Sequence, residues 1–216
     1  MVDETTPKKI CLFGPQGSGK GTQAERLVGL FGVPHVSPGN IFRQAVAEGS
    51  ELGLKVESII NSGSLVPDEV TNQLVKERLE LEDCLDGFVL DGYPRNEVQA
   101  VALDEVSTLT HVIVIEIPDE ESISRISMRR TCSNCGMTYH LQSKPSKVEG
   151  VCDSCGSELV QRDDDKPEAI RHRLNIYHQE TEPLIKRYED RGVLHRIDGR
   201  GSIDAVWERV QSCFFS

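Results

Sequence analysis

The chain has 216 residues, a formal net charge of −11, a hydrophobic content of 38% and a charged content of 27%. These values are typical of a soluble globular protein with one sizeable core. No apolar run approaches the ~20 residues of a membrane span, and residues 1–9 contain no signal-peptide core, which predicts a cytoplasmic protein. The acidic charge argues against general binding of nucleic acid or of an anionic membrane, so neither is an expected partner.

The N-terminal part of the chain contains a glycine-rich stretch, GPQGSGKGT, at residues 14–22. It follows an apolar run over residues 10–13 and precedes a helical pattern over residues 23–31, which is the context of a phosphate-binding loop. Glycines allow backbone N–H groups to surround an anion, and the helix N-terminus adds partial positive charge. Lys20 can reach the outer phosphates of a nucleotide, and the hydroxyl that usually follows this lysine comes one residue later, at Thr22.

A small helical excursion follows a short predicted strand at residues 33–37. Its helices are expected over residues 41–48 and 51–61, and residues 62–67 form an extended connection. Because this segment is too short to hold a core of its own, we expect it to be a mobile flap on the main domain. Asp68 is then predicted to cap a helix that runs to about residue 82.

Residues 87–92 form a predicted strand that carries an acid, Asp91, at its end. Ligands of open α/β sheets bind at the carboxyl ends of the strands, so Asp91 is expected to hold Mg²⁺, through water, beside the phosphates. A helix over residues 96–106 and a nearly continuous apolar strand over residues 111–117 are predicted next.

Two arginines lie four residues apart on the helix that Asp119 opens. Arg125 and Arg129 therefore share one helix face, which predicts a clamp on the charge of a triphosphate. A solvated basic face is the alternative interpretation.

Two Cys-x2-Cys pairs indicate a metal site. Cys132, Cys135, Cys152 and Cys155 have the spacing of a tetrathiolate zinc site, and a glycine follows each pair, as the tight turn requires. Four thiolates leave no open position, so the zinc is predicted to be structural and to hold together a segment with only a few short strands. The six histidines show no catalytic or metal-ligand spacing.

The C-terminal part completes an α/β pattern. A long helix is predicted over residues 166–190, a fifth strand over residues 193–198 and a closing helix over residues 202–214. Five strands that alternate with helices predict a three-layer α/β/α domain with a parallel sheet.

The motifs together resemble the adenylate kinase family, in its long form with a zinc-bearing lid. The resemblance extends from Lys9 to Phe214 and implies a sheet order of 2-3-1-4-5, a monomer, and reversible phosphoryl transfer from ATP with Mg²⁺ to AMP, giving two ADP. It also implies three parts, namely a core (1–37, 67–127 and 166–216), an acceptor flap (38–66) and a lid (128–165). It rests on residues 14–23, 37–43 and 87–95, Gln99, residues 125–130, the four cysteines, residues 162–165 and Arg173.

The resemblance further implies a role for each site residue. The catalytic residues would be Lys20, Asp91, Arg95, Arg129, Arg162 and Arg173. ATP would be bound by Gly17, Ser18, Gly19, Lys20, Gly21, Thr22, Arg125, Arg129, Thr138, Tyr139 and Gly201, with Arg125 stacked on the base. AMP would be bound by Pro38, Arg43, Ser64, Leu65, Val66, Gly92, Tyr93, Pro94, Arg95, Gln99, Arg162 and Arg173.

Three residues depart from the family pattern. Pro38 stands where adenylate kinases usually carry Thr, Asn40 replaces their usual Asp, and Met128 replaces a Gly at the lid hinge. The first two concern the acceptor site, so a kinase for UMP, CMP or GMP is the main alternative. The remote alternative is a zinc-ribbon protein that binds nucleic acid and uses the phosphate loop as a switch.

Overall fold

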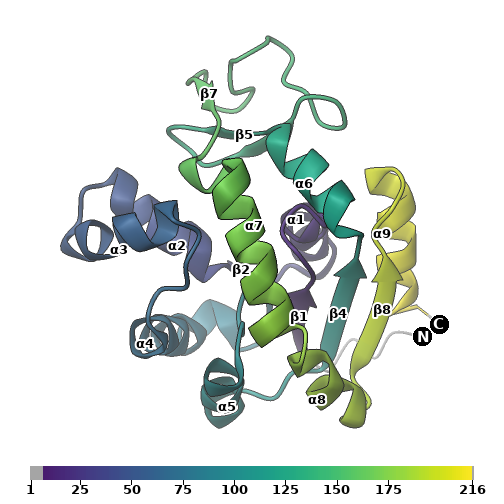
Figure 1. Ribbon diagram of the computed structural model, residues 1–216. Helices are drawn as coiled ribbons and strands as arrows, with labels where there is room; N and C mark the ends of the chain where they lie inside the picture. The colour runs from purple at the N-terminus through teal and green to yellow at the C-terminus, as the bar shows by residue number, and fades with distance from the viewer. Residues whose placement is uncertain (1–6, 216) are drawn as a thin grey trace.

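The computed structural model of the protein describes residues 7–215, and its centre is one parallel sheet (Figure 1). Within these residues five strands form the sheet in the order β2-β3-β1-β4-β8, which confirms the predicted order of the five strands. They are β1 (Lys8–Phe13), β2 (His35–Val36), β3 (Gly87–Asp91), β4 (His111–Glu116) and β8 (Leu194–Asp198).

Helices cover both faces of the sheet, as the alternation of strands and helices predicts (Figure 1). On one face lie α1 (Lys20–Phe31) and α9 (Ile203–Ser212). On the other face lie α4 (Asp68–Leu79), α5 (Glu97–Val106) and α8 (Leu184–Asp190). None of the helices in residues 7–215 is both long enough and apolar enough to cross a membrane.

Each face of the sheet has its own apolar cluster, because neighbouring residues of a strand point to opposite sides. In β4, Ile113 packs with Leu27 and Val210 on one side, and Val112 packs in the cluster of Leu103 on the other. These side chains are almost wholly removed from water, and each stabilises the fold by about 1.5–3 kcal/mol. Burial on both faces explains why the central strands are nearly continuous apolar runs.

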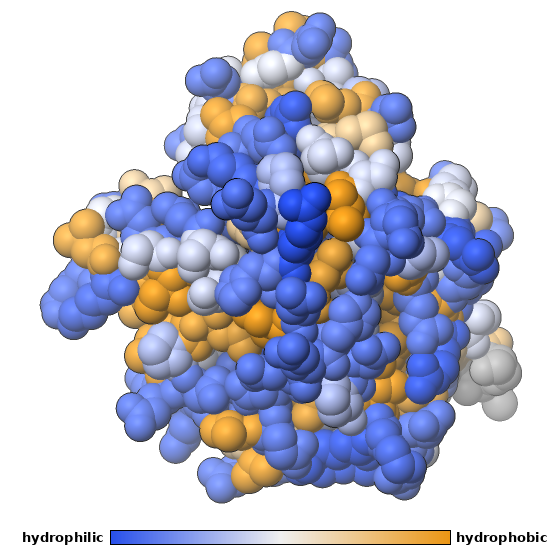
Figure 2. All heavy atoms as spheres, in the orientation of Figure 1, coloured by the Kyte–Doolittle hydropathy of each residue, from blue (hydrophilic) through white to orange (hydrophobic). Residues whose placement is uncertain are grey.

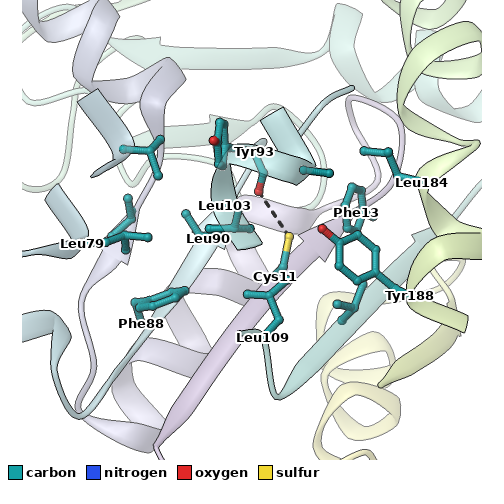
Figure 3. Packing of buried hydrophobic residues seen from close by; sticks show 14 of the residues in the cluster. Cys11, Phe13, Leu79, Phe88, Leu90, Tyr93, Leu103, Leu109, Leu184 and Tyr188 are labelled. Carbon is teal, nitrogen blue, oxygen red and sulfur yellow. Dashed lines mark hydrogen bonds between the residues drawn. The ribbon is translucent and has the colours of Figure 1, made fainter. Parts of the chain in front are cut away.

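The cluster beneath the end of β1 is drawn in Figure 3. The Cys11 thiol donates a hydrogen bond to the Tyr93 carbonyl at 3.2 Å, and the Phe13 and Tyr188 ring centroids are 5.5 Å apart. Burial, and to a smaller extent the charge of Asp91, raises the pKa of the Cys11 thiol well above its usual value. Cys11 is therefore an inert core residue, and the cluster supports the strand ends from which the glycine-rich loop and Asp91 emerge.

The predicted flap consists of α2 (Pro38–Ala47) and α3 (Glu51–Asn61), with a small apolar cluster of its own that includes Phe42, Val56 and Val66. The expected bounds of α3 are confirmed, whereas α2 begins at Pro38 rather than at residue 41. Proline suits the first turn of a helix because its missing N–H would be unpaired there. The two helices are in contact at Gly53, where an added Cβ would lie 2.1 Å from the Ala45 carbonyl oxygen.

The predicted lid is built on a small antiparallel sheet with the order β6-β5-β7 in the described residues. Its strands are β5 (Arg129–Cys132), β6 (Thr138–His140) and β7 (Leu159–Val160). Helix α6 (Asp119–Ser127) leads into this sheet and α7 (Pro167–Ile176) leads out of it, so the sheet lies above the core in Figure 1.

Three further sequence predictions about helices are wrong. Arg125 and Arg129 do not share a helix face, because α6 ends at Ser127 and Arg129 lies in β5. The expected helix over residues 166–190 is divided into α7, a π-helical segment (Tyr177–Thr181) and α8, because Pro183 has no N–H to continue the hydrogen-bond ladder. The Glu182 N–H donates instead to the Tyr177 carbonyl, at 2.8 Å. Asp68 does not cap α4, since the cap residue is Pro67 and no side chain accepts a hydrogen bond there.

Candidate active site

A cavity of about 710 Å³ opens at the carboxyl ends of the central strands, where the sequence places the phosphate loop and Asp91. This volume is in the range of about 300–1,000 Å³ that is usual for a ligand pocket. The loop, the flap, the lid and α7 all contribute to its walls, and hydrophilic side chains dominate the surface along α7 (Figure 2). A second cavity, of about 50 Å³, shares Arg43, Arg95 and Arg173 with the large one.

The structure brings almost all of the predicted site residues to these two cavities. The large cavity is lined by Gly17, Ser18, Gly19, Lys20, Gly21, Thr22, Arg43, Leu65, Asp91, Gly92, Pro94, Arg95, Arg125, Arg129, Thr138, Tyr139, Arg162, Arg173 and Gly201. The small cavity is lined by Pro38, Arg43, Ser64, Leu65, Val66, Gly92, Arg95, Gln99 and Arg173, among others. Tyr93 packs in the core instead, where its hydroxyl donates to Asn72 Oδ1 at 2.9 Å and to the Gln99 carbonyl at 3.1 Å.

The glycine-rich loop is held between β1, α6 and α7. Gly14 has φ +137°, and an added Cβ would lie 2.3 Å from the Ile115 carbonyl oxygen, so only glycine fits there. The Gln16 side chain donates to the Ile170 carbonyl at 2.7 Å, and the Ser122 hydroxyl donates to the Gln16 carbonyl at 2.5 Å. The loop is thus tied to both helices that lead to and from the lid.

Lys20 lies against the loop rather than extending from it. Its Nζ donates to the carbonyls of Gly14 at 2.7 Å and Pro15 at 2.8 Å. Burial lowers the pKa of Lys20 to about 8, against an opposing effect of the Asp91 charge. Lys20 is therefore mostly charged at neutral pH and lies beside the space where phosphates would bind.

Asp91 lies beside the start of α1, where an added Cβ on Gly21 would be 3.6 Å from Asp91 Oδ2. Burial alone would raise the pKa of Asp91, but the nearby His35 and Lys20 outweigh it and keep the pKa below its ordinary value. The carboxylate is therefore ionised at neutral pH. An ionised oxygen ligand next to a phosphate loop fits Mg²⁺. His35 Nε2 is 3.7 Å from Asp91 Oδ2, although the spacing of the histidines in the sequence predicts no role in the site for His35.

The arginines of the site are paired with two acids that the sequence analysis did not assign a role. Asp164 accepts hydrogen bonds from two arginines, at 2.7 Å from Arg162 Nε to Oδ1 and at 2.8 Å from Arg173 to Oδ2. Asp165 accepts one from Arg129, at 2.9 Å from Nε to Oδ2. Both acids are at most 5% exposed. The signal was present in the sequence as an acidic run directly after Arg162. The acids neutralise and orient the guanidinium groups in the folded protein.

The ATP-side residues named in the sequence analysis lie around Arg125. Its guanidinium donates to the Gly199 carbonyl at 2.9 Å and forms an ion pair with Glu121, which fixes it at the cavity wall. Tyr139 also lines the cavity, but its hydroxyl accepts a hydrogen bond from the Asp153 N–H at 2.8 Å and so faces the cysteine cluster.

The four cysteine sulfurs of the lid converge on one point. All four Sγ atoms lie within 4.8 Å of one another, and the Sγ–Sγ distances are 3.4 Å for Cys132–Cys155 and 3.6 Å for Cys135–Cys152. Four converging thiols without disulfide bonds fit a tetrahedral zinc ion. Cys11, Cys84 and Cys213 lie in or beside other apolar clusters.

Known proteins are similar to this chain along nearly its whole length. A family model described as adenylate kinase matches residues 12–193. The adenylate kinase of Fervidobacterium nodosum is 50% identical over 202 residues, which cover 91% of this chain and 93% of the relative. The adenylate kinase of Caldanaerobacter subterraneus subsp. tengcongensis is 50% identical over 208 residues, which cover 94% of each chain. That of Archaeoglobus fulgidus is 48% identical over 208 residues, which cover 94% of this chain and 96% of the relative.

These matches agree with the resemblance noted in the sequence and with the geometry of the cavities. The phosphate loop, the acid at the end of β3 and the paired arginines occur in one site, on the expected sheet. The chain belongs to the adenylate kinase family.

Proposed function

We propose that the protein transfers the γ-phosphoryl group of ATP reversibly to AMP, giving two ADP. The observation that supports this best is that Arg43, Arg95 and Arg173 line both cavities, so that their charges face the place where two ligands meet. ATP would occupy the large cavity against the loop, and AMP the small one. The protein would act in the cytoplasm as a monomer.

The reaction requires positioning and charge more than acid–base chemistry. An oxygen of the AMP phosphate bonds to the γ-phosphorus while the bond from that phosphorus to the bridging β-oxygen breaks, and the electron pair stays on the departing ADP. The attacking oxygen is already ionised, so no general base is needed. Lys20 and the guanidinium groups of Arg95, Arg129, Arg162 and Arg173 stabilise the equatorial oxygens. Mg²⁺ held by Asp91 would neutralise phosphate charge.

Water would compete with AMP as the acceptor. We infer that residues 38–66 form a flap over AMP and that residues 128–165 form a lid over ATP. Residues 7–37, 67–127 and 166–215 would form the core on which both close, and residues 1–6 and 216 of the expected core lie outside the described residues. Closure over both substrates excludes water and brings Arg162, which belongs to the lid, to the transferred group.

The direct test is ADP formation from ATP and Mg²⁺ with AMP, GMP, UMP and CMP supplied separately. We expect AMP to give the highest kcat/KM. A higher value with UMP, CMP or GMP would replace the proposed acceptor, and ADP formation without any monophosphate would indicate a hydrolase.

Removal of zinc is expected to destabilise the lid without abolishing the chemistry. One zinc per chain should co-purify, and chelation or Cys132→Ser should lower Tm by several degrees, at about 2–4 °C per kcal/mol for a chain of this size. Activity at low temperature should persist, because four thiolates leave no ligand position for substrate. Elemental analysis and calorimetry measure both effects, with Cys213→Ser as the control that leaves zinc bound. Absence of metal would refute the site, and immediate loss of activity with the lid still folded would make the zinc catalytic.

Pro38→Thr is expected to tighten AMP binding. Pro38 is buried at the first position of α2 and lines the small cavity, where it offers neither a hydroxyl nor a backbone N–H. One added neutral hydrogen bond is worth roughly 0.5–1.5 kcal/mol, which predicts a KM for AMP about three- to tenfold lower and an unchanged KM for ATP. Pro38→Val has the shape of threonine without the hydroxyl and is the matched control. A KM for AMP that is unchanged or higher in Pro38→Thr contradicts the argument.

A further inference from the structure

The Gln99 side chain is locked in the wall of the small cavity. Its Nε2 donates to Asp68 Oδ1 at 2.7 Å, and its Oε1 accepts from the Arg95 N–H at 2.8 Å. Gln99 is 2% exposed, and its own N–H donates to Asn96 Oδ1 at 2.9 Å. Asn96 also donates to Asp68, at 3.0 Å to Oδ1. Main chain and side chain of Gln99 are therefore both held in place.

The chemistry of the two partners determines which way the Gln99 amide faces. A backbone N–H can only donate, so the oxygen of the amide must face Arg95. A carboxylate at neutral pH can only accept, so the nitrogen must face Asp68. A flipped amide would place its oxygen against the Asp68 carboxylate and its NH₂ group against the Arg95 N–H, and both hydrogen bonds would be lost.

The locked amide leaves one N–H donor and one oxygen lone pair for a ligand. Such a pair matches a base edge that offers a ring-nitrogen acceptor beside an amino donor, as adenine does. Hypoxanthine and guanine offer the reverse, a ring N–H beside a carbonyl oxygen. To bind them equally well, the amide would have to flip.

We propose that Asp68 is a positioning residue that fixes the orientation of the Gln99 amide and thereby makes the acceptor site select AMP over IMP and GMP. The inference rests on the proposed function and deepens it. It also explains why Asp68, in the first turn of α4, makes no capping hydrogen bond. Its carboxylate instead faces Asn96, the N-cap of α5, and Gln99 in the first turn of α5. Asp68 acts through Gln99 and needs no contact with the substrate.

AMP and IMP provide the sharpest test, because they have nearly the same size and differ in the donor and acceptor pattern of one edge. The quantity to measure is the ratio of kcat/KM for AMP to kcat/KM for IMP. A smaller amount of folded protein lowers both values by the same factor and leaves this ratio unchanged. The wild-type protein should prefer AMP strongly. Asp68→Ala should lower the ratio by about tenfold or more, since a hydrogen bond to a charged group no longer opposes the flip. KM for ATP should not change.

Glu69→Ala is the matched control. Glu69 is the next acid in the first turn of α4 and is exposed, so its removal changes the charge and the helix-dipole interaction in the same way without touching Gln99. Its AMP-to-IMP ratio should equal that of the wild type. Asp68→Asn keeps one acceptor oxygen and should retain more of the ratio than Asp68→Ala. If Asp68→Ala does not fold, Asp68→Asn is used instead, and the proposal then requires its AMP-to-IMP ratio to lie below the wild-type value.

An unchanged ratio in folded Asp68→Ala would overturn the proposal, and so would a wild-type protein that does not prefer AMP to IMP. Gln99→Leu tests whether Gln99 determines the choice of base. If Gln99→Leu keeps the wild-type AMP-to-IMP ratio, Gln99 does not recognise the base, and the orientation of its amide has no effect on selectivity. If the wild-type protein does not phosphorylate AMP, the proposed function itself fails.

Discussion

Lys20→Met is expected to lower kcat by a factor on the order of 10² or more while leaving the fold intact. Lys20 Nζ lies within hydrogen-bond distance of the Gly14 and Pro15 carbonyls, in the loop that faces the large cavity. A bound triphosphate would place its outer oxygens beside this charge. Methionine has a similar length and fills the same space without the charge. The substitution therefore removes the electrostatic stabilisation of the phosphoryl group during transfer and leaves the packing unchanged.

Initial rates of ADP formation with saturating ATP and AMP measure this effect, and thermal unfolding verifies the fold. Lys186→Met, on the exposed face of α8, is the control that removes one positive charge far from the cavity. The pH dependence gives a second check, because the pKa of Lys20 in the ligand-free protein is about 8. The kcat/KM for ATP should therefore fall as the pH rises above about 8 in the wild-type protein. A near-normal kcat in folded Lys20→Met would remove Lys20 from the mechanism.

Asp164→Asn is expected to have the largest effect on stability among the single substitutions at the site. Asp164 is buried and accepts charged hydrogen bonds from Arg162 and Arg173. Removing one partner of a buried ion pair leaves the others uncompensated, which costs about 3–5 kcal/mol. The open cavity admits water to the guanidinium groups, so we expect the lower end, about 3 kcal/mol in the free energy of unfolding.

The pH dependence of this effect follows from the direction of the pKa shift. Burial would raise the pKa of Asp164, but the charges of Arg173 and Arg162 outweigh it and hold the pKa well below its usual range. The stabilisation is thus fully present above the unfolded-state pKa of about 3.9 and is lost as the pH falls below it. The difference between wild type and Asp164→Asn should be constant from pH 5 to 7, on the order of 3 kcal/mol, and should shrink below about pH 4.

Denaturant unfolding at several pH values measures the difference. The matched control is Asp163→Asn, because Asp163 is exposed and pairs only with the exposed Lys166 among the described ion pairs. A difference of less than about 1 kcal/mol between the free energies of unfolding of the wild type and Asp164→Asn at pH 7 would contradict the argument, because that is the contribution of an ordinary surface ion pair.

Residues that are close in sequence determined much of this site. The glycine-rich loop, the zinc ligands and the acid at the end of β3 are local patterns, because a turn, a pair of thiols or a strand end is built from consecutive residues. The helix over Glu51–Asn61 was predicted with its observed bounds for the same reason. The sheet order followed from the resemblance to the family, and the alternation of strands and helices supported only the parallel arrangement.

Errors arose where a distant segment competes with a local preference. A first-turn acid usually favours capping, but Asp68 is drawn to Asn96 and Gln99 by charged hydrogen bonds across about thirty positions of sequence. The helical pattern after Lys166 continues across Pro183 in the sequence, whereas the backbone opens into a π-helical segment before it. Local sequence propensity cannot predict these two outcomes. Each depends on a distant hydrogen-bond partner or on a backbone hydrogen-bond ladder that exists only in the folded chain.

The sequence by itself determined the kind of chemistry, since a phosphate loop, a strand-end acid and clustered arginines are chemical types that can be read from residue identity. Only the tertiary structure decided how these groups are held. It pairs Arg162 and Arg173 with Asp164, and it orients the Gln99 amide between Asp68 and the Arg95 N–H. The physical reason is that a hydrogen bond depends on distances of about 3 Å and on direction, and residues far apart in the chain acquire that geometry only through packing.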